Sequence, residues 1–282
     1  MFVIKSIRNY FKVMSPLAYN TEVCMIFLET NCYSHSLMRR VEFNVLLPEC
    51  KKSNNAVGIS DGKYKTIWLL HGLSDDQNSW VRRSSIERYA EKYGFAVVMP
   101  NVDRSWYTDT AYGAKYFTFI TKELPEICRG CFKGMSADRE DNIIAGLSMG
   151  GYGALKSALL CPDNYGFCIS LSGSLDITRK GRPCNLKEWK SIFNFDMEAP
   201  IELEGSEHDL FAVSRKNREL GLKFPKIYMW CGTEDNLNKI NHDFDEELTR
   251  LGVEHTFEES EGDHSWKWWD MHIESALAHL FS

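Results

Sequence analysis

The sequence predicts an α/β fold: a mostly parallel central sheet of about eight strands with helices on both faces. Short apolar runs that end in glycine or proline alternate along the chain with segments of helical pattern, as in a sheet whose strands are joined by helical crossovers. Several runs, such as residues 65–72 and 95–101, are apolar nearly throughout, which is typical of strands buried on both faces. Ligands bind such sheets beyond the carboxyl ends of the strands, so candidate residues are expected there.

The first two expected strands are separated by a polar turn, and the second partly alternates between apolar and polar residues. The later strands are short apolar runs, and the last helix carries an apolar stripe typical of core packing. The expected strands are residues 25–33, 40–47, 65–72, 95–101, 142–148, 166–173, 226–232 and 254–260. The expected helices are residues 79–93, 115–131, 150–160, 209–220, 238–251 and 265–280.

Two segments depart from this alternation of strands and helices. Residues 174–223, after the sixth strand, form an interval of about fifty residues with polar clusters, and connections of this length are usually functional. We expect a lid-like insertion over the site, within a single domain of residues 25–282. Residues 1–24 are interpreted as a loosely ordered extension. Basic residues interrupt its apolar stretch, so it lacks the core of a secretory signal, although it could form a surface-seeking amphipathic helix.

Composition narrows the class of protein. The chain has 282 residues and a formal net charge of -6, which argues against nucleic acid as a partner. Its nine cysteines lie mostly in apolar runs, as expected of buried, reduced thiols in a cytoplasmic protein. A homo-oligomer is possible. No apolar run approaches the roughly 18 residues of a membrane span. Cys128 and Cys131 form a lone C-x-x-C without a second ligand pair, so no metal site is expected.

A glycine-flanked serine marks the junction of an expected strand and helix. Residues 146–150 read Gly-Leu-Ser-Met-Gly, the G-x-S-x-G pattern of a nucleophile elbow. A sharp strand-to-helix turn that exposes a serine hydroxyl tolerates little side-chain bulk two residues before or after it. Ser148 is therefore the candidate nucleophile. Residues 58–62 also match, but a polar segment precedes Ser60 and a strand follows it, so that match is rejected.

A serine nucleophile needs a base, and the base needs an acid to orient it. In the order serine, acid, histidine, the candidates are Asp235 and His264, each just beyond the end of an expected strand. Glu234 competes with Asp235 for the acid role, and Asp263 is a weaker competitor because it adjoins His264.

Backbone N–H groups and aromatic residues complete the candidate site. The N–H of Met149, directly after the serine, and that of Leu73, after the third strand, are the expected oxyanion donors. Trp106, Tyr107 and Trp266 lie near the same edge of the sheet and are candidate walls for a substrate, with plain core packing as the alternative.

Several motifs, taken together in this order, resemble the putative-esterase family of α/β-hydrolases, and bacterial tributyrin esterases in particular. They are "WLLHGLSDDQNSW", "VVMPNVDRSWYTDT", "FITKELPEI", "IIAGLSMGGYGALKSAL", "CGTED" and "GDHSWKWW", and the likeness runs from about Met25 to the C-terminus. The resemblance implies an α/β-hydrolase fold and cofactor-free hydrolysis of short-chain acyl esters. It also implies that Ser148, Asp235 and His264 are catalytic, with oxyanion donors at Leu73 and Met149.

The expected function is thus a serine carboxylesterase acting on a small-molecule ester. Two alternatives stay open. One is another acyl hydrolase with the same residues, either an S-formylglutathione hydrolase or thioesterase, or an acetyl or feruloyl sugar esterase. The other is an inactive hydrolase fold used as a binding module, because fold alone does not imply activity; the intact serine, acid and histidine argue against it.

Overall fold

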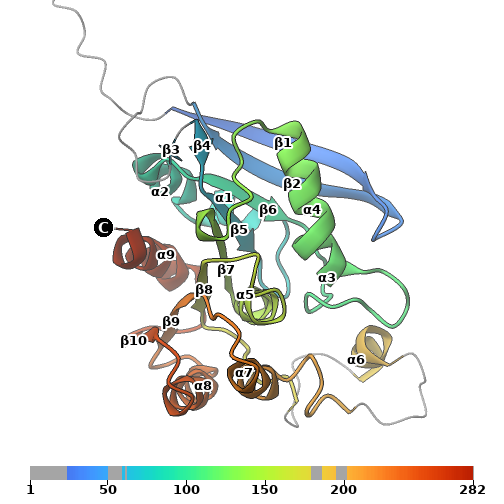
Figure 1. Cartoon of the computed structure of the whole chain (residues 1–282), viewed down its shortest axis with the longest axis vertical. Coiled ribbons are helices and arrows are strands. Elements are labelled where there is room, and N and C mark those ends of the chain that lie inside the picture. The colour runs from blue at the N-terminus through green and yellow to red at the C-terminus, as the bar shows by residue number, and fades with distance from the viewer. Residues whose placement is uncertain (1–23, 50–58, 61, 179–185, 195–201, 282) are drawn as a thin grey trace, which may run out of the picture.

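An eight-stranded sheet forms the centre of the molecule (Figure 1), with the strand order β1-β2-β6-β5-β7-β8-β9-β10. The computed structural model describes residues 24–49, 59–60, 62–178, 186–194 and 202–281. The first two strands run antiparallel to each other, β2 runs antiparallel to β6, and all other neighbours are parallel. The strands are β1 (Met25–Ser34), β2 (Arg39–Pro48), β5 (Thr66–Leu70), β6 (Ala96–Pro100), β7 (Asn142–Leu147), β8 (Phe167–Leu171), β9 (Lys226–Gly232) and β10 (His255–Ser260). The predicted α/β architecture is confirmed.

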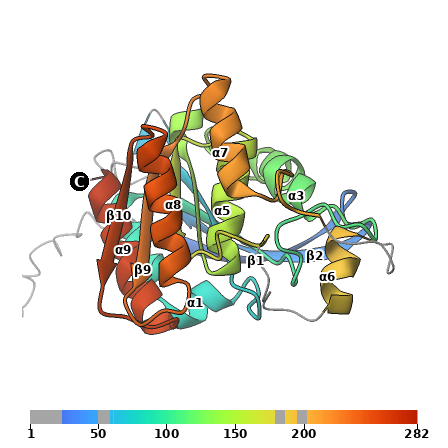
Figure 2. The ribbon, with the colours of Figure 1, turned by 90° about the horizontal axis from the view of Figure 1, so that it is seen from below.

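Helices cover both faces of this sheet (Figures 1 and 2). One face packs against α1 (Ser79–Arg83), α2 (Ile86–Tyr93) and α9 (Trp266–Phe281). The other face packs against α3 (Tyr116–Thr118), η1 (Phe119–Glu123), α4 (Leu124–Cys131), α5 (Met149–Leu160), α7 (Leu210–Glu219) and α8 (Asn238–Arg250). A 3-10 turn, η2 (Arg139–Asp141), precedes β7. In the part of the chain that the structure describes, no helix is long and apolar enough to cross a membrane.

The two layers explain why the central strands are apolar throughout. In β5, Ile67 and Leu69 enter the core on the α9 side, whereas Trp68 and Leu70 enter the core on the α5 side. Successive side chains of a strand point to opposite faces. A strand covered on both faces therefore buries every residue, and all five residues of β5 are buried.

One helix expected from the sequence is divided in the structure. Residues 79–93 form α1 and α2, with Ser84 extended between them. The Asp270 carboxylate of α9 accepts hydrogen bonds from the Ser85 N–H (2.8 Å) and the Tyr89 hydroxyl (3.0 Å). The break therefore depends on a residue nearly two hundred positions away, which the local helical pattern does not report.

The expected helix at residues 115–131 is continuous but contains a π-helical stretch, η1. Pro125, the second residue of α4, has no N–H to donate to the carbonyl one turn earlier. The π-helical stretch ends two residues before this proline, at the turn whose carbonyl would otherwise accept from the missing N–H.

The insertion packs onto the body of the molecule through aromatic side chains. Its described residues include α6 (Leu186–Phe193) and the expected helix, observed as α7. Trp189 of α6 is fully buried, and its ring lies 5.3 Å from that of Trp106. Segments 179–185 and 195–201 lie outside the described residues, as does the expected extension except for Cys24. The domain boundaries therefore remain a prediction.

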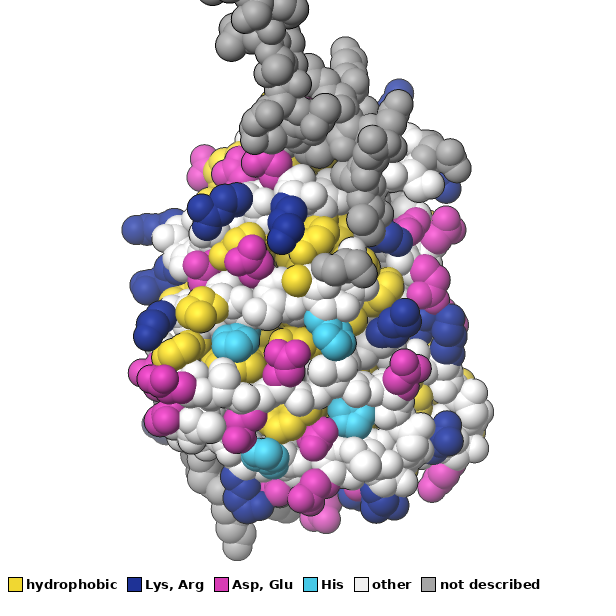
Figure 3. Space-filling model, turned by 90° about the vertical axis from the view of Figure 1, so that its left-hand side faces the viewer, with side chains coloured by type: hydrophobic (Ala, Val, Ile, Leu, Met, Phe, Trp, Pro, Cys, Tyr) yellow, Lys and Arg dark blue, Asp and Glu magenta, His cyan; other side chains and the backbone are white. Residues whose placement is uncertain are grey.

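Histidines gather on the face of the molecule seen in Figure 3. Hydrogen bonds and ring contacts join histidines of α8, β10 and α9 to neighbouring elements. His255 of β10 contacts Asp245 of α8, and His242 of α8 contacts Glu259 of β10. His272 of α9 stacks on Trp230 of β9 with a ring separation of 3.9 Å. These side chains fasten α8 and α9 to the end of the sheet, which agrees with a structural role for them.

We predict that Trp189→Ala lowers the free energy of unfolding by about 3–5 kcal/mol, because it removes a fully buried indole. Urea unfolding measures the change. Lys187→Ala, an exposed change in the same helix, is the control and should shift it by less than about 0.5 kcal/mol. Equal, small effects of both changes would contradict the packing of α6 on the body.

Candidate active site

Ser148 occupies a strained turn between β7 and α5. Its backbone has φ 53° and ψ -116°, a conformation that residues with a side chain rarely adopt. A Cβ added at Gly146 would lie 2.4 Å from the carbonyl oxygen of Gly150, and one added at Gly150 would lie 2.5 Å from that of Leu70. Only glycine fits at these two positions, and the resulting turn leaves the Ser148 side chain half-buried at the edge of a cavity.

The second match to the pattern has no such setting. Ser60 lies in β3 (Ile59–Ser60), which pairs with β4 (Lys63–Tyr64) in a two-stranded sheet away from the central one. Its side chain is exposed, and no helix follows it. The structure therefore agrees with the rejection of Ser60.

Loops that follow β9 and β10 bring an acid and a histidine to the serine. His264 Nε2 lies 3.0 Å from Ser148 Oγ, and His264 Nδ1 lies 2.8 Å from Asp235 Oδ2. A carboxylate can only accept, so the hydrogen on Nδ1 points to Asp235. Nε2 is then left to accept the hydrogen bond from the Ser148 hydroxyl.

Asp235 is placed for this contact, and Glu234 is not. The Asp235 side chain is fully buried, and its other oxygen accepts from the Leu237 N–H at 2.8 Å. Burial alone would raise the pKa of Asp235, but the hydrogen bonds from His264 and the Leu237 N–H outweigh it and hold the pKa below its usual value. The carboxylate beside the imidazole is therefore charged near neutral pH.

Glu234 instead joins the acid loop to the histidine loop. Its carboxylate accepts from the Gly262 N–H at 2.6 Å, and its own N–H donates to the Gly262 carbonyl at 2.9 Å. Asp263 is exposed and accepts from the Ser265 hydroxyl. Of the three acids that the sequence left open, the structure brings Asp235 to the imidazole.

Trp269 orients the imidazole from the side. Its ring meets that of His264 edge-on, with centroids 4.9 Å apart and an interplanar angle of 86°, and its Nε1–H donates to Ser172 Oγ at 3.1 Å. Sequence reasoning assigned Trp269 to the core alone. No local signal reveals the contact with His264, because it arises where α9 passes the end of β8.

Two backbone N–H groups are available beside the serine. Met149 is the first residue of α5, and the first N–H groups of a helix have no carbonyl partner within it. Leu73 follows β5 in a loop of residues 71–75, the β5 loop, and lines the same cavity as Ser148. Among the described residues, no hydrogen bond engages the Leu73 N–H.

A cavity of about 1010 Å³ opens over these groups. Its lining is mixed. Beside Ser148 and His264 it includes the apolar side chains Trp106, Ile177, Leu237, Trp266 and Trp269 and the charged side chains Asp75, Arg83, Asp176 and Lys267. Trp106 and Trp266 thus lie where a substrate wall was expected.

The expectation for Tyr107 as a substrate wall is wrong. Its side chain is fully buried and does not line the cavity. Positive φ angles at both Trp106 (53°) and Tyr107 (50°) turn the tyrosine inward, and its hydroxyl donates to the His71 carbonyl at 2.8 Å. Tyr107 therefore supports the β5 loop through this hydrogen bond to His71.

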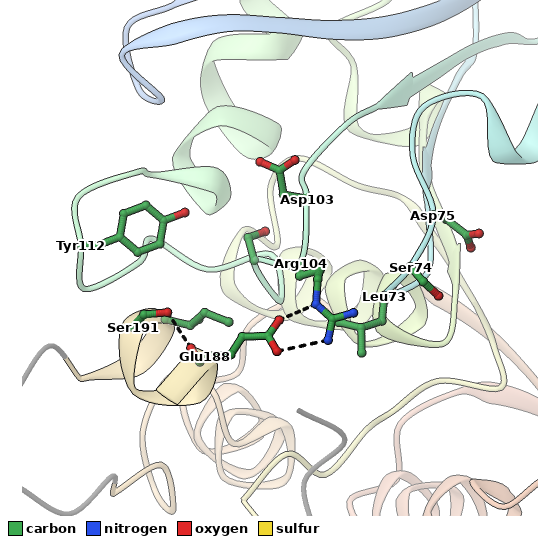
Figure 4. A pocket seen from close by; sticks show the side chains of 10 residues that line it. Leu73, Ser74, Asp75, Asp103, Arg104, Tyr112, Glu188 and Ser191 are labelled. Carbon is green, nitrogen blue, oxygen red and sulfur yellow. Dashed lines mark hydrogen bonds and ion pairs between the residues drawn. The ribbon is translucent and has the colours of Figure 1, made fainter. Parts of the chain in front are cut away.

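A second, polar cavity of about 560 Å³ adjoins the first and shares Leu73, Ser74 and Asp75 with it. Figure 4 shows Arg104 paired with Glu188 of α6 through two contacts across this cavity. The insertion therefore forms one wall of a charged space next to the candidate site.

Comparisons with known proteins agree on a family. The model of the family described as "Putative esterase" matches residues 34–280. An acetyl esterase of Caldicellulosiruptor saccharolyticus is 31% identical over 90% of this chain and 97% of its own. The substrate-bound structure of fluorophosphonate-binding serine hydrolase F of Staphylococcus aureus is 33% identical with a TM-score of 0.83, over 92% of this chain and 99% of that one. An S-formylglutathione hydrolase of Staphylococcus aureus is also 33% identical, with a TM-score of 0.79, over 92% and 100%.

We predict that Gly150→Ala lowers the free energy of unfolding by about 1–3 kcal/mol or more, because its Cβ would collide with the Leu70 carbonyl oxygen. Gly130→Ala in α4 is the matched control. Its Cβ meets nothing within 4 Å, so it should be neutral or stabilise the helix by up to about 1 kcal/mol. Urea unfolding of both variants measures the difference, and equal effects would contradict the tight turn.

Proposed function

The chain belongs to the putative-esterase family and is a carboxylic ester hydrolase, and on that premise we propose that it is a serine carboxylesterase for short-chain acyl esters. The family resemblance inferred from its motifs is confirmed. The observation that carries the proposal is the chain of two contacts from Ser148 Oγ to His264 and on to Asp235, at 3.0 and 2.8 Å.

These contacts support acyl transfer through the serine. Ser148 Oγ attacks the ester carbonyl carbon while His264 Nε2 takes the hydroxyl proton. The tetrahedral intermediate collapses, the bond to the alkoxide breaks, and His264 returns the proton to the departing alcohol. Asp235 holds the imidazole and stabilises its charged form. An acyl group remains on Ser148.

The negative charge of the tetrahedral intermediate falls on the former carbonyl oxygen. We propose that the backbone N–H groups of Met149 and Leu73 donate hydrogen bonds to this negatively charged oxygen. Water then enters the cavity, loses a proton to His264 and attacks the acyl carbon. The bond from this carbon to Ser148 Oγ breaks, His264 returns the proton to Oγ, and the acid leaves.

The preference for short acyl groups follows from the family resemblance, and the indoles of Trp106 and Trp266 in the cavity lining are the walls proposed to meet the acyl group. The polar cavity with its Arg104–Glu188 pair supports a second candidate, an acyl hydrolase whose substrate carries a polar portion. S-formylglutathione and acetylated or feruloylated sugars are of that kind.

The three residues should differ in their effect on kcat for p-nitrophenyl acetate. Ser148→Ala should lower it by about 10⁴-fold or more, and Asp235→Asn by up to about 10⁴-fold, because the nucleophile and the imidazole tautomer are lost. Glu234→Gln is the matched control for the acid and should cost less than about tenfold, since its carbonyl oxygen still accepts from Gly262. A larger loss for Glu234→Gln than for Asp235→Asn would contradict the assignment.

A substrate panel tests chain length. We expect kcat/KM for p-nitrophenyl acetate and butyrate to exceed that for the octanoate by about tenfold or more, because a misfit in a walled pocket costs about that much. A value that rises through octanoate would reject the short-chain proposal. If S-formylglutathione or an acetylated xylose is turned over faster than every simple ester, the second candidate is correct.

A further inference from the structure

A fully buried lysine lies on the helix that carries the nucleophile. Lys156 of α5 has no exposed surface, and its Nζ contacts the Tyr107 carbonyl (3.2 Å), Thr108 Oγ1 (2.8 Å) and His208 Nδ1 (3.1 Å). An ammonium group has three hydrogens to donate, and these three atoms can accept them. Thr108 directs its own hydrogen to the Trp106 carbonyl at 3.0 Å, so its oxygen accepts from Lys156.

Two of these acceptors belong to a strained stretch of backbone. Trp106 and Tyr107 are consecutive residues with φ near 50°, and each such residue costs about 1–3 kcal/mol unless its surroundings hold it. The Tyr107 ring also packs so closely on α5 that a Cβ at Gly153 would lie 2.3 Å from it. Lys156 is thus part of what holds residues 106–108 against the helix.

The same stretch supports the β5 loop. The Tyr107 hydroxyl donates to the His71 carbonyl at 2.8 Å, and the Val102 N–H donates to His71 Nε2 at 3.1 Å. Leu73 follows His71 by two residues. A continuous path of hydrogen bonds and covalent backbone therefore leads from the Lys156 ammonium to the loop that bears the Leu73 N–H.

The third acceptor belongs to the insertion. His208 precedes α7, and its carbonyl accepts from the Tyr152 hydroxyl of α5 at 3.2 Å. From α6 of the same insertion, Trp189 packs on Trp106. Lys156 and its neighbours therefore join three parts of the chain: the nucleophile helix, the strained stretch and the insertion.

We propose that Lys156 is a positioning residue, whose buried amino group fixes residues 106–108 and thereby the β5 loop, so that the Leu73 N–H faces the oxyanion. It acts through Tyr107 and His71 and touches no reacting atom. This role rests on the proposed function, since the oxyanion belongs to that reaction. Through the same contacts, both the packing of the insertion on the molecule and the geometry of the site depend on the Lys156 side chain.

An apolar side chain would remove the cost of burying a charge but would leave three acceptors without a donor. Burial lowers the pKa of Lys156 to about 7, against the attraction of Glu207 and Asp109. Burial and the lysine charge lower the pKa of His208 to about 3. Burial raises the pKa of Tyr107 and that of Tyr152 well above the usual value.

The first test replaces the ammonium with a side chain of similar length. Lys156→Met should lower kcat for p-nitrophenyl acetate by about 10- to 100-fold, part of the loss for one oxyanion donor, with KM changed less than about threefold. The rate of Ser148 phosphonylation by a fluorophosphonate should fall in parallel. Lys216→Met, the same change at an exposed position of α7, is the control and should leave both unchanged.

Thr108→Val is the second variant, in case Lys156→Met does not fold. It keeps the shape of the side chain but removes one acceptor, and it should lower kcat by about 3- to 10-fold. Hydrogen exchange should also become faster at residues 104–110 in the variants. Folded variants that keep kcat within about twofold of the original would overturn the proposal.

The pH dependence of stability tests the burial of the Lys156 amino group without any measurement of activity. Between pH 7 and about 10 the unfolded lysine keeps its proton while the folded one loses it, so the free energy of unfolding should rise with pH in the original chain. His208, Tyr107 and Tyr152 stay neutral in that window, so the rise should be smaller in Lys156→Met. An identical pH dependence would contradict a buried lysine that loses its proton in the folded chain, whereas a chain without hydrolase activity but with this difference would reject only the proposed function.

Discussion

The turn at Ser148 is the constraint on which the rest of the site depends. Its positive φ angle is stable only because Gly146 and Gly150 let the carbonyls of the turn and of β5 approach without a side chain between them. That approach also brings the β5 loop beside the serine. The following helix, α5, is buried along almost its whole length, so the strain of the turn is held by a large area of apolar packing.

The sheet supplies the remaining groups by its topology. Strands β7, β8, β9 and β10 are parallel neighbours, so the loops at their carboxyl ends meet at one edge. Within that edge, Glu234 and Gly262 hold the acid loop to the histidine loop, and Trp269 limits the rotation of the imidazole. Contacts between neighbouring loops therefore hold Asp235 and His264 in position beside the serine.

The insertion connects the wall of the polar cavity to this arrangement. Both Trp189 and His208 come from the insertion. Trp189 packs on Trp106 of the strained stretch, residues 106–108, that supports the β5 loop, and His208 contacts Lys156, which donates to the Tyr107 carbonyl of the same stretch. Glu188 of the same segment lines the polar cavity through its pair with Arg104. A change in the insertion can thus alter both the polar cavity and the contacts that support the β5 loop.

Local patterns were sufficient to predict the order of strands and helices, the turn at Ser148 and the histidine that serves it, because burial and steric demands of short segments leave their mark on nearby residues. Other features depend on segments that meet only in the folded chain. The break between α1 and α2 depends on Asp270, and the inward turn of Tyr107 depends on α5 and His71. Asp235 and Glu234 are adjacent in one loop, so their sequence context is the same. Only the approach of β10 and its loop decided which of the two carboxylates contacts His264, because that depends on the direction of each side chain in three dimensions.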